Sequence, residues 1–155
     1  MITSEVLDLR ECFGFPGMRV LQFAFDSEGK LNPHLPHNYP RNCVVYTGTH
    51  DNDTTIGWFR NLSEPGAVTG KDRYIALRYL DTTGEEINWD LIRLALSSEA
   101  DTIIIPFQDI LGLGSEARMN TPGTVSGNWE WRLRKELLTS KIGERLKELT
   151  EISDR

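Results

Sequence analysis

Three short runs of mostly apolar residues divide the chain, and each is short enough to be a β-strand. They cover residues 18–25, 43–46 and 102–107 and are rich in β-branched and aromatic side chains. Runs without regular polar alternation are typical of strands in a parallel sheet whose two faces are both covered. Pro106 marks the end of the third run, because proline cannot donate a hydrogen bond to a β-ladder.

Segments between and after these runs carry apolar residues at helical spacing. Thr3 is positioned to cap a helix at the amino terminus, with Ile2 packing on Leu7, while Asn88 and Asn128 are positioned to cap two later helices. Helices are therefore predicted within the first dozen residues, at the short segment that begins with 56–59, and over 71–80 and 89–98. A last helix is predicted to begin at 129, followed by an amphipathic tail that reaches 152.

The remaining segments are rich in glycine, proline and asparagine and predict loops. They cover residues 26–42, 63–70 and 111–127. Loops as long as the first and third are uncommon inside a compact domain and are usually functional.

Alternation of strands with helical segments predicts βα units of a parallel sheet, and so an α/β fold. A closed barrel of eight such units takes roughly 250 residues, so this chain has room for about three of them. Either a small three-layer domain or the last part of a barrel whose first strands lie elsewhere fits the pattern. In both cases residues 1–155 are expected to form a single unit, because the length suffices for one core and not for two.

Composition limits the classes of partner. The formal net charge is −6, and no basic patch is visible, so no nucleic-acid partner is expected. Cys12 and Cys43 each lie beside apolar residues and are predicted to be reduced core thiols. No basic segment precedes an apolar run at the amino terminus and no apolar run spans a membrane, so a cytoplasmic protein without a membrane partner is expected.

Ionisable and amide side chains cluster directly after the second run. Gly48 allows the chain to turn, and His50, Asp51, Asn52 and Asp53 follow within a few positions. Such groups are costly to bury without partners, which favours the mouth of a ligand cleft at the carboxyl end of a parallel strand. The alternative for residues 52–55 is a turn that caps the next helix.

A metal-dependent phosphoesterase is another interpretation of the same cluster. It would combine His50, Asp51 and Asp53 with His34 and His37 as ligands. Enzymes of that class also need an Asp-x-His block after an earlier strand, and residues 26–28 read Asp-Ser-Glu. We therefore expect no metal ion and no cofactor.

Several longer motifs resemble one known family. The resemblance to the carboxyl-terminal part of the 4-α-glucanotransferases, also called amylomaltases or disproportionating enzymes, covers essentially the whole chain in the same order. The matching motifs lie at residues 20–25, 35–40, 44–54, 105–114, 117–124 and 128–132.

The resemblance implies the carboxyl-terminal part, about three βα units, of a (β/α)8 barrel, with the strands usually counted sixth to eighth. The family transfers α-1,4-glucan segments between maltodextrins with retention of configuration, which requires a nucleophile and an acid/base about 5 Å apart. In the family both precede the region matched here, so the chain alone is expected to be inactive. A non-catalytic α-glucan-binding fragment is the alternative. Expected partners are maltodextrins and either the missing amino-terminal part or a second copy of the chain.

The resemblance also implies roles for single residues. Asp51 would stabilise the transition state through hydrogen bonds to ring hydroxyls of the glucose at the cleavage point, and His50 would hold a hydroxyl of the same sugar. Asn120 and Asp26 would contact neighbouring sugars. Trp58 would offer a face for sugar stacking, with core packing as the favoured alternative for this residue.

Overall fold

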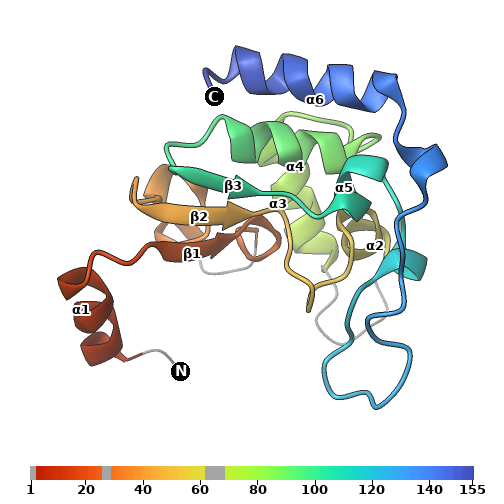
Figure 1. Ribbon diagram of the computed structural model, residues 1–155. Coiled ribbons are helices and arrows are strands. Elements are labelled where there is room, and N and C mark those ends of the chain that lie inside the picture. The colour runs from red at the N-terminus through yellow and green to blue at the C-terminus, as the bar shows by residue number, and fades with distance from the viewer. Residues whose placement is uncertain (1–2, 26–28, 62–68) are drawn as a thin grey trace.

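The computed structural model describes residues 3–25, 29–61 and 69–155 and contains a parallel sheet of three strands (Figure 1). The strands are β1 (Gly17–Val20), β2 (Cys43–Tyr46) and β3 (Thr102–Ile104), in the order β1-β2-β3. Val45 at the centre pairs with Arg19 on one side and Ile103 on the other. The predicted α/β class is therefore confirmed, with spatial order equal to sequence order.

Six α-helices occur in the described residues. The predicted helix over 71–80 begins one residue earlier, and a capping box between Thr69 and Asp72 fixes its start. In Figure 1, α1 stands apart from the rest of the molecule and α6 runs along α4. The helices are α1 (Ser4–Cys12), α2 (Thr55–Arg60), α3 (Gly70–Leu80), α4 (Ile87–Leu96), α5 (Phe107–Leu111) and α6 (Ser140–Ile152). None of the described helices has the length and apolar character needed to cross a membrane.

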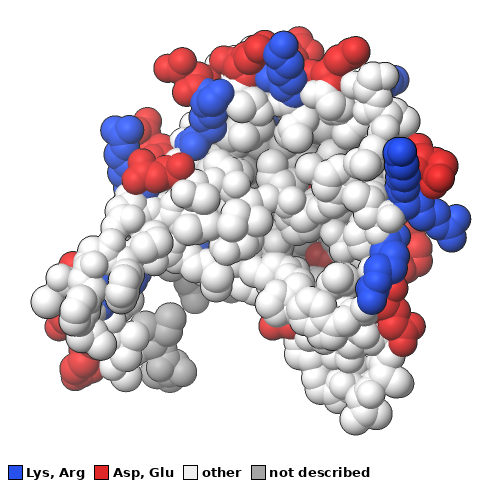
Figure 2. Space-filling view, in the orientation of Figure 1, with Lys and Arg blue, Asp and Glu red and all other residues white. Residues whose placement is uncertain are grey.

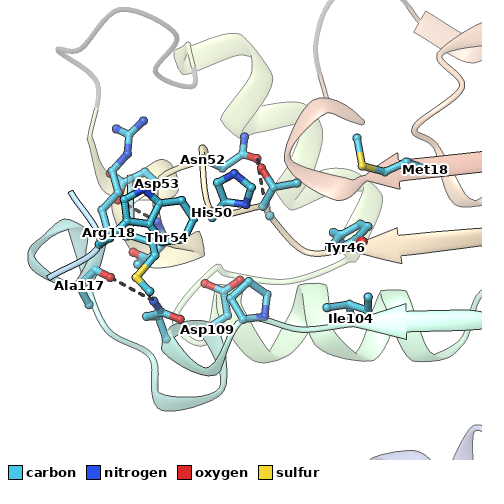
Figure 3. A pocket seen from close by; sticks show the side chains of 16 residues that line it. Met18, Tyr46, His50, Asn52, Asp53, Thr54, Ile104, Asp109, Ala117 and Arg118 are labelled. Carbon is cyan, nitrogen blue, oxygen red and sulfur yellow. Dashed lines mark hydrogen bonds between the residues drawn. The ribbon is translucent and has the colours of Figure 1, made fainter. Parts of the chain in front are cut away.

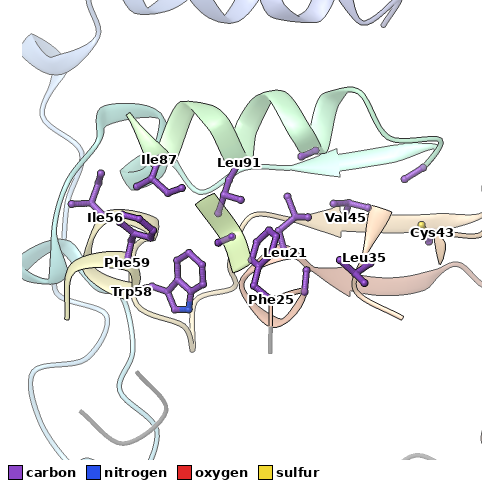
Figure 4. Packing of buried hydrophobic residues seen from close by; sticks show 14 residues of the cluster. Leu21, Phe25, Leu35, Cys43, Val45, Ile56, Trp58, Phe59, Ile87 and Leu91 are labelled. Carbon is purple, nitrogen blue, oxygen red and sulfur yellow. The ribbon is translucent and has the colours of Figure 1, made fainter. Parts of the chain in front are cut away.

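The main core lies between one face of the sheet and the helices. Val45 of β2, Leu91 of α4 and Phe59 of α2 belong to this one cluster of apolar side chains (Figure 4). All three side chains are buried. Burial of apolar side chains of this size supplies most of the stability of such a layer, at about 1.5–3 kcal/mol each.

A second core holds the carboxyl-terminal helix. Ile92 of α4 is buried against the apolar stripe of α6, which includes Leu146. Arg145 of α6 lies over the Trp89 ring, 4.2 Å from its centroid, and donates two hydrogen bonds to the Glu86 carboxylate. The amphipathic tail predicted from the sequence is thus a helix that packs on α4.

The other face of the sheet has no helix over it in the described residues (Figure 1). Met18 is 56% exposed and Ile104 is 44% exposed on this face, and Tyr46 is only partly buried. The expectation that the strands are covered on both faces is therefore wrong for this chain.

The first and third strands are shorter than predicted. β1 ends at Val20, opposite the last residue of β2, and residues 21–23 turn into a 3₁₀ helix. Leu21, at the start of this turn, and Phe25, just after it, are both buried in the main core. β3 ends at Ile104, and residue 107 already begins α5.

Three further predictions are wrong: two helix caps and one core thiol. Asn88 lies inside α4, where its side chain donates to the Asp109 carbonyl instead of capping the helix. No helix begins at Asn128, because its side chain closes a loop by binding the backbone of Thr121. Cys43 is buried as predicted, whereas Cys12 is exposed, on a helix α1 that contains no buried residue.

Candidate functional site

A hollow of about 380 Å³ opens at the carboxyl ends of the strands. Figure 2 shows it on a face with few charged side chains, and acidic atoms are visible inside it. Parallel sheets usually bind ligands at this end, where the loops after the strands converge. Figure 3 shows the side chains that line it, among them Met18, Tyr46, Ile104, His50, Asn52, Asp53, Asp109, Arg118 and Trp129.

The loop after β2 presents His50 and Asp51 together. His50 Nε2 lies 3.4 Å from Asp51 Oδ1, and the two side chains are 55% and 53% exposed. His50 also lines the hollow. An imidazole and a carboxylate are therefore available to solvent side by side at the mouth of the site.

A segment distant in sequence, which contains Arg118 and Asn120, forms hydrogen bonds with His50 and Asp51. Asn120 Nδ2 donates to Asp51 Oδ1 at 2.6 Å, and its backbone N–H donates to the His50 carbonyl at 3.1 Å. Arg118 donates to the Asp51 carbonyl at 2.9 Å. Both side-chain contacts of Asp51 fall on Oδ1, so Oδ2 is left without a hydrogen-bond partner among the described residues. His50, Asp51 and Asn120, named from the sequence, thus lie in one cluster.

Asp109 accepts hydrogen bonds from both ends of the loop that carries His50 and Asp51. Its carboxylate accepts from Thr47 Oγ1 at 2.6 Å, directly after β2, and from the backbone N–H of Thr55 at 2.7 Å, where α2 begins. Asp109 is only 1% exposed. Burial raises the pKa of the Asp109 carboxyl, while the bonds from Thr47 and Thr55 act in the opposite direction.

Asp53 ties the same loop to two other segments. Its carbonyl accepts from Gln22 Nε2 at 2.9 Å, and its carboxylate accepts from Ser115 Oγ at 2.6 Å. Thr54 caps α2, since its hydroxyl accepts from the Gly57 N–H. The capping alternative for this stretch is therefore confirmed at Thr54, while Asp53 serves as an anchor.

Gly57→Ala is expected to lower the free energy of unfolding by about 1 kcal/mol, although alanine is ordinarily the better helix former. A Cβ atom at Gly57 would lie 2.5 Å from both Asp53 Oδ2 and Ser115 Oγ, so it would force that hydrogen-bonded pair apart. Urea denaturation measures the change.

Gly143→Ala is the matched control, because no atom lies within 4 Å of a Cβ at that position of α6. It is expected to raise the free energy of unfolding by about 0.5–1 kcal/mol. Equal effects at the two glycines would contradict the close packing around Asp53.

The other residues named from the sequence lie elsewhere. Trp58 is 8% exposed and packs between Phe25 and Phe59 in the main core (Figure 4), and it does not line the hollow. This burial favours the core-packing alternative over sugar stacking. Asp26 lies outside the described residues.

Sequence reasoning missed Trp129 as a wall of the hollow. The predicted helix from Asn128 would have buried this ring, whereas it is 51% exposed and lies 5.0 Å from the His50 ring, between centroids. Gly123 and Gly127, which both adopt positive φ, are the sequence signal that irregular backbone continues up to this tryptophan.

Nothing in the described residues supports a metal site. No group of three or more His, Cys, Asp or Glu side chains is arranged to hold an ion there. His34 and His37 do not line the hollow that holds His50 and Asp53: His34 Nδ1 accepts from the Val20 N–H, and His37 Nδ1 lies 3.3 Å from the Tyr79 hydroxyl. The ligand set of the phosphoesterase alternative is therefore not brought together in the described residues.

Similarity to known proteins defines the class to which the chain belongs. The family described as 4-alpha-glucanotransferase matches residues 1–139. This chain is therefore a member of the 4-alpha-glucanotransferase family.

Individual relatives agree with this assignment and show how much of the family's length is present. The 4-alpha-glucanotransferase of Thermus thermophilus is 50% identical over 163 residues, which cover 100% of this chain and 31% of the relative. That of Synechocystis is 52% identical, again over 100% of this chain and 30% of the relative. The amylomaltase of Streptococcus agalactiae, solved in complex with acarbose, superimposes with a TM-score of 0.91 at 37% identity, covering 100% of this chain and 30% of that one. The chain thus spans about a third of the length of these relatives.

Proposed function

We propose that this chain is the carboxyl-terminal part of a 4-α-glucanotransferase barrel and forms one wall of its glucan site. The observation that carries the proposal is the convergence of His50, Asp51 and Asn120 at the carboxyl ends of the strands, in a member of this family. Each is a hydrogen-bonding side chain suited to sugar hydroxyls.

The open sheet face supports the barrel part of the proposal. Three parallel strands in sequential order, with helices on one side only, are what a segment of a (β/α)8 barrel contains. The missing strands would pair with the outer edges of β1 and β3. They would also cover Met18, Tyr46 and Ile104, which line the inner face.

Asp51 is proposed to stabilise the transition state. Its Oδ2 has no partner in the described part of the chain, so it is available to accept from a ring hydroxyl, and Asn120 orients the carboxylate through Oδ1. Such bonds strengthen as the sugar becomes oxocarbenium-like, and they then contribute to rate more than to ground-state binding. His50 would bind a further hydroxyl of the same sugar.

The nucleophile and the acid/base are proposed to come from the rest of the barrel. Asp53 and Asp109, the two carboxylates that line the hollow, already accept hydrogen bonds from Ser115, Thr47 and Thr55. Because the chain spans only about a third of its relatives' length, a glucan-binding fragment without catalysis is the second candidate.

A graft tests the proposal. We would replace the matching 31% of the Thermus thermophilus relative by this chain and incubate the chimera with maltotriose. Glucose and longer maltodextrins are expected from the chimera and not from the 155-residue chain alone. A correctly folded chimera without transfer activity would contradict the proposed role, and products from the chain alone would contradict the assignment of the two catalytic carboxyls to the missing part.

A further inference from the structure

Trp129 has an unusual backbone for a bulky residue. Its φ is +62°, in the left-handed region that glycine adopts readily and large side chains avoid. Such strain persists only where surrounding contacts enforce it, and it concentrates at ligand sites.

Hydrogen bonds of Trp129 and of Asn128, the residue before it, hold this backbone conformation. The Trp129 N–H donates to the Met119 carbonyl at 2.7 Å, which closes the loop between them. Inside that loop, Asn128 accepts from the Thr121 N–H at 2.8 Å and donates to Thr124 Oγ1 at 2.9 Å. The indole is therefore positioned before any ligand arrives.

Core packing does not explain the position of the ring. Trp129 belongs to neither hydrophobic cluster of the described residues and is 51% exposed, on the wall of the hollow. Its ring lies beside that of His50 at an interplanar angle of 41°. The side chain thus offers an apolar face to solvent next to the polar pair His50 and Asp51.

We propose that Trp129 is a sugar-stacking residue, which receives the apolar C–H face of one α-1,4-linked glucose unit while His50 and Asp51 bind hydroxyls at its edge. A pyranose ring has an apolar face bordered by hydroxyl groups, so an aromatic plane beside hydrogen-bonding side chains matches it. This inference rests on the proposed glucan site and adds the residue that orients the sugar within it.

Nuclear magnetic resonance of the 155-residue chain, titrated with acarbose, tests the inference. The indole N–H signal of Trp129, assigned from the Trp129→Phe variant, is expected to shift together with the side-chain amide signals of Asn120. Shifts at Asn120 without a shift at Trp129 would overturn the stacking role and leave the proposed glucan site standing. If neither signal moves at saturating acarbose, both the site and the stacking role are overturned in this chain.

A second variant separates binding from folding. Trp129→Gly removes the ring at a position where glycine is unstrained, so the fold is expected to be retained while the acarbose dissociation constant rises about tenfold. Val125→Gly is the matched control, since Val125 lies in the same loop, is fully exposed and does not line the hollow. An unchanged dissociation constant in folded Trp129→Gly, or an equal loss in Val125→Gly, would overturn the proposal.

Discussion

Asp51→Asn, introduced into a chimera that supplies the rest of the barrel, is expected to lower the turnover of glucan transfer by about 10²-fold or more. Asparagine keeps the size of the side chain and its contact with Asn120 while removing the negative charge. The charge matters most when the sugar becomes cationic, so turnover is expected to fall far more than KM rises. Initial rates with maltotriose, measured over a range of concentrations, separate the two constants.

Asp101→Asn provides the control for this experiment. Asp101 is also an exposed carboxylate in an ion pair, with Arg41, and it precedes β3 at the opposite end of the strand. Its replacement is expected to leave turnover unchanged, and thermal unfolding should show that both variants are folded. Turnover in Asp51→Asn equal to that of the parent would remove Asp51 from the mechanism.

Asp109→Ala is expected to lower the free energy of unfolding by about 2–4 kcal/mol. The change leaves the Thr47 hydroxyl and the Thr55 N–H buried without their acceptor, and relief of the buried charge offsets only part of that cost. Urea denaturation of the chain measures the difference. A loss below about 0.5 kcal/mol would show that the hydrogen bonds from Thr47 and Thr55 to Asp109 are not needed for folding.

The pH dependence of stability gives an independent test of the same carboxyl. Burial raises the pKa of Asp109 above its ordinary value of 3.8, so the folded chain keeps a proton that the unfolded chain has released. The contribution of this group to stability therefore falls as pH rises from about 4 through the folded pKa. Asp109→Asn cannot titrate, so its stability relative to the parent is expected to increase over that interval. A constant difference would contradict the raised pKa.

The centre of the fold was predictable because local pattern and tertiary environment agree there. β2 has the predicted limits, and α2 begins within a residue of its expected start, since Thr54 is both a good cap and free to act as one. Asn88 and Asn128 are equally good caps by local criteria. Each instead binds a backbone group brought close by the tertiary fold, which no local pattern records.

The candidate site was predictable only in part for the same reason. His50 and Asp51 are neighbours in sequence, so their joint exit from β2 follows from the pattern of the strand. Asn120 reaches them across 69 positions, and only the family resemblance pointed to it. For Trp129 the sequence predicts a helix, from the cap residue Asn128 and the apolar residues that follow it. The structure instead gives this residue a positive φ, which a large aromatic side chain rarely adopts and which no local pattern indicates.

A crystal structure of the chimera with acarbose tests the central claim most directly. The account predicts a sugar ring in the hollow with its hydroxyls within hydrogen-bond distance, about 2.6–3.2 Å, of Asp51 Oδ2 and of the His50 imidazole. A sugar bound in the barrel with both of these side chains turned onto protein groups, or lying out of its reach, would contradict it.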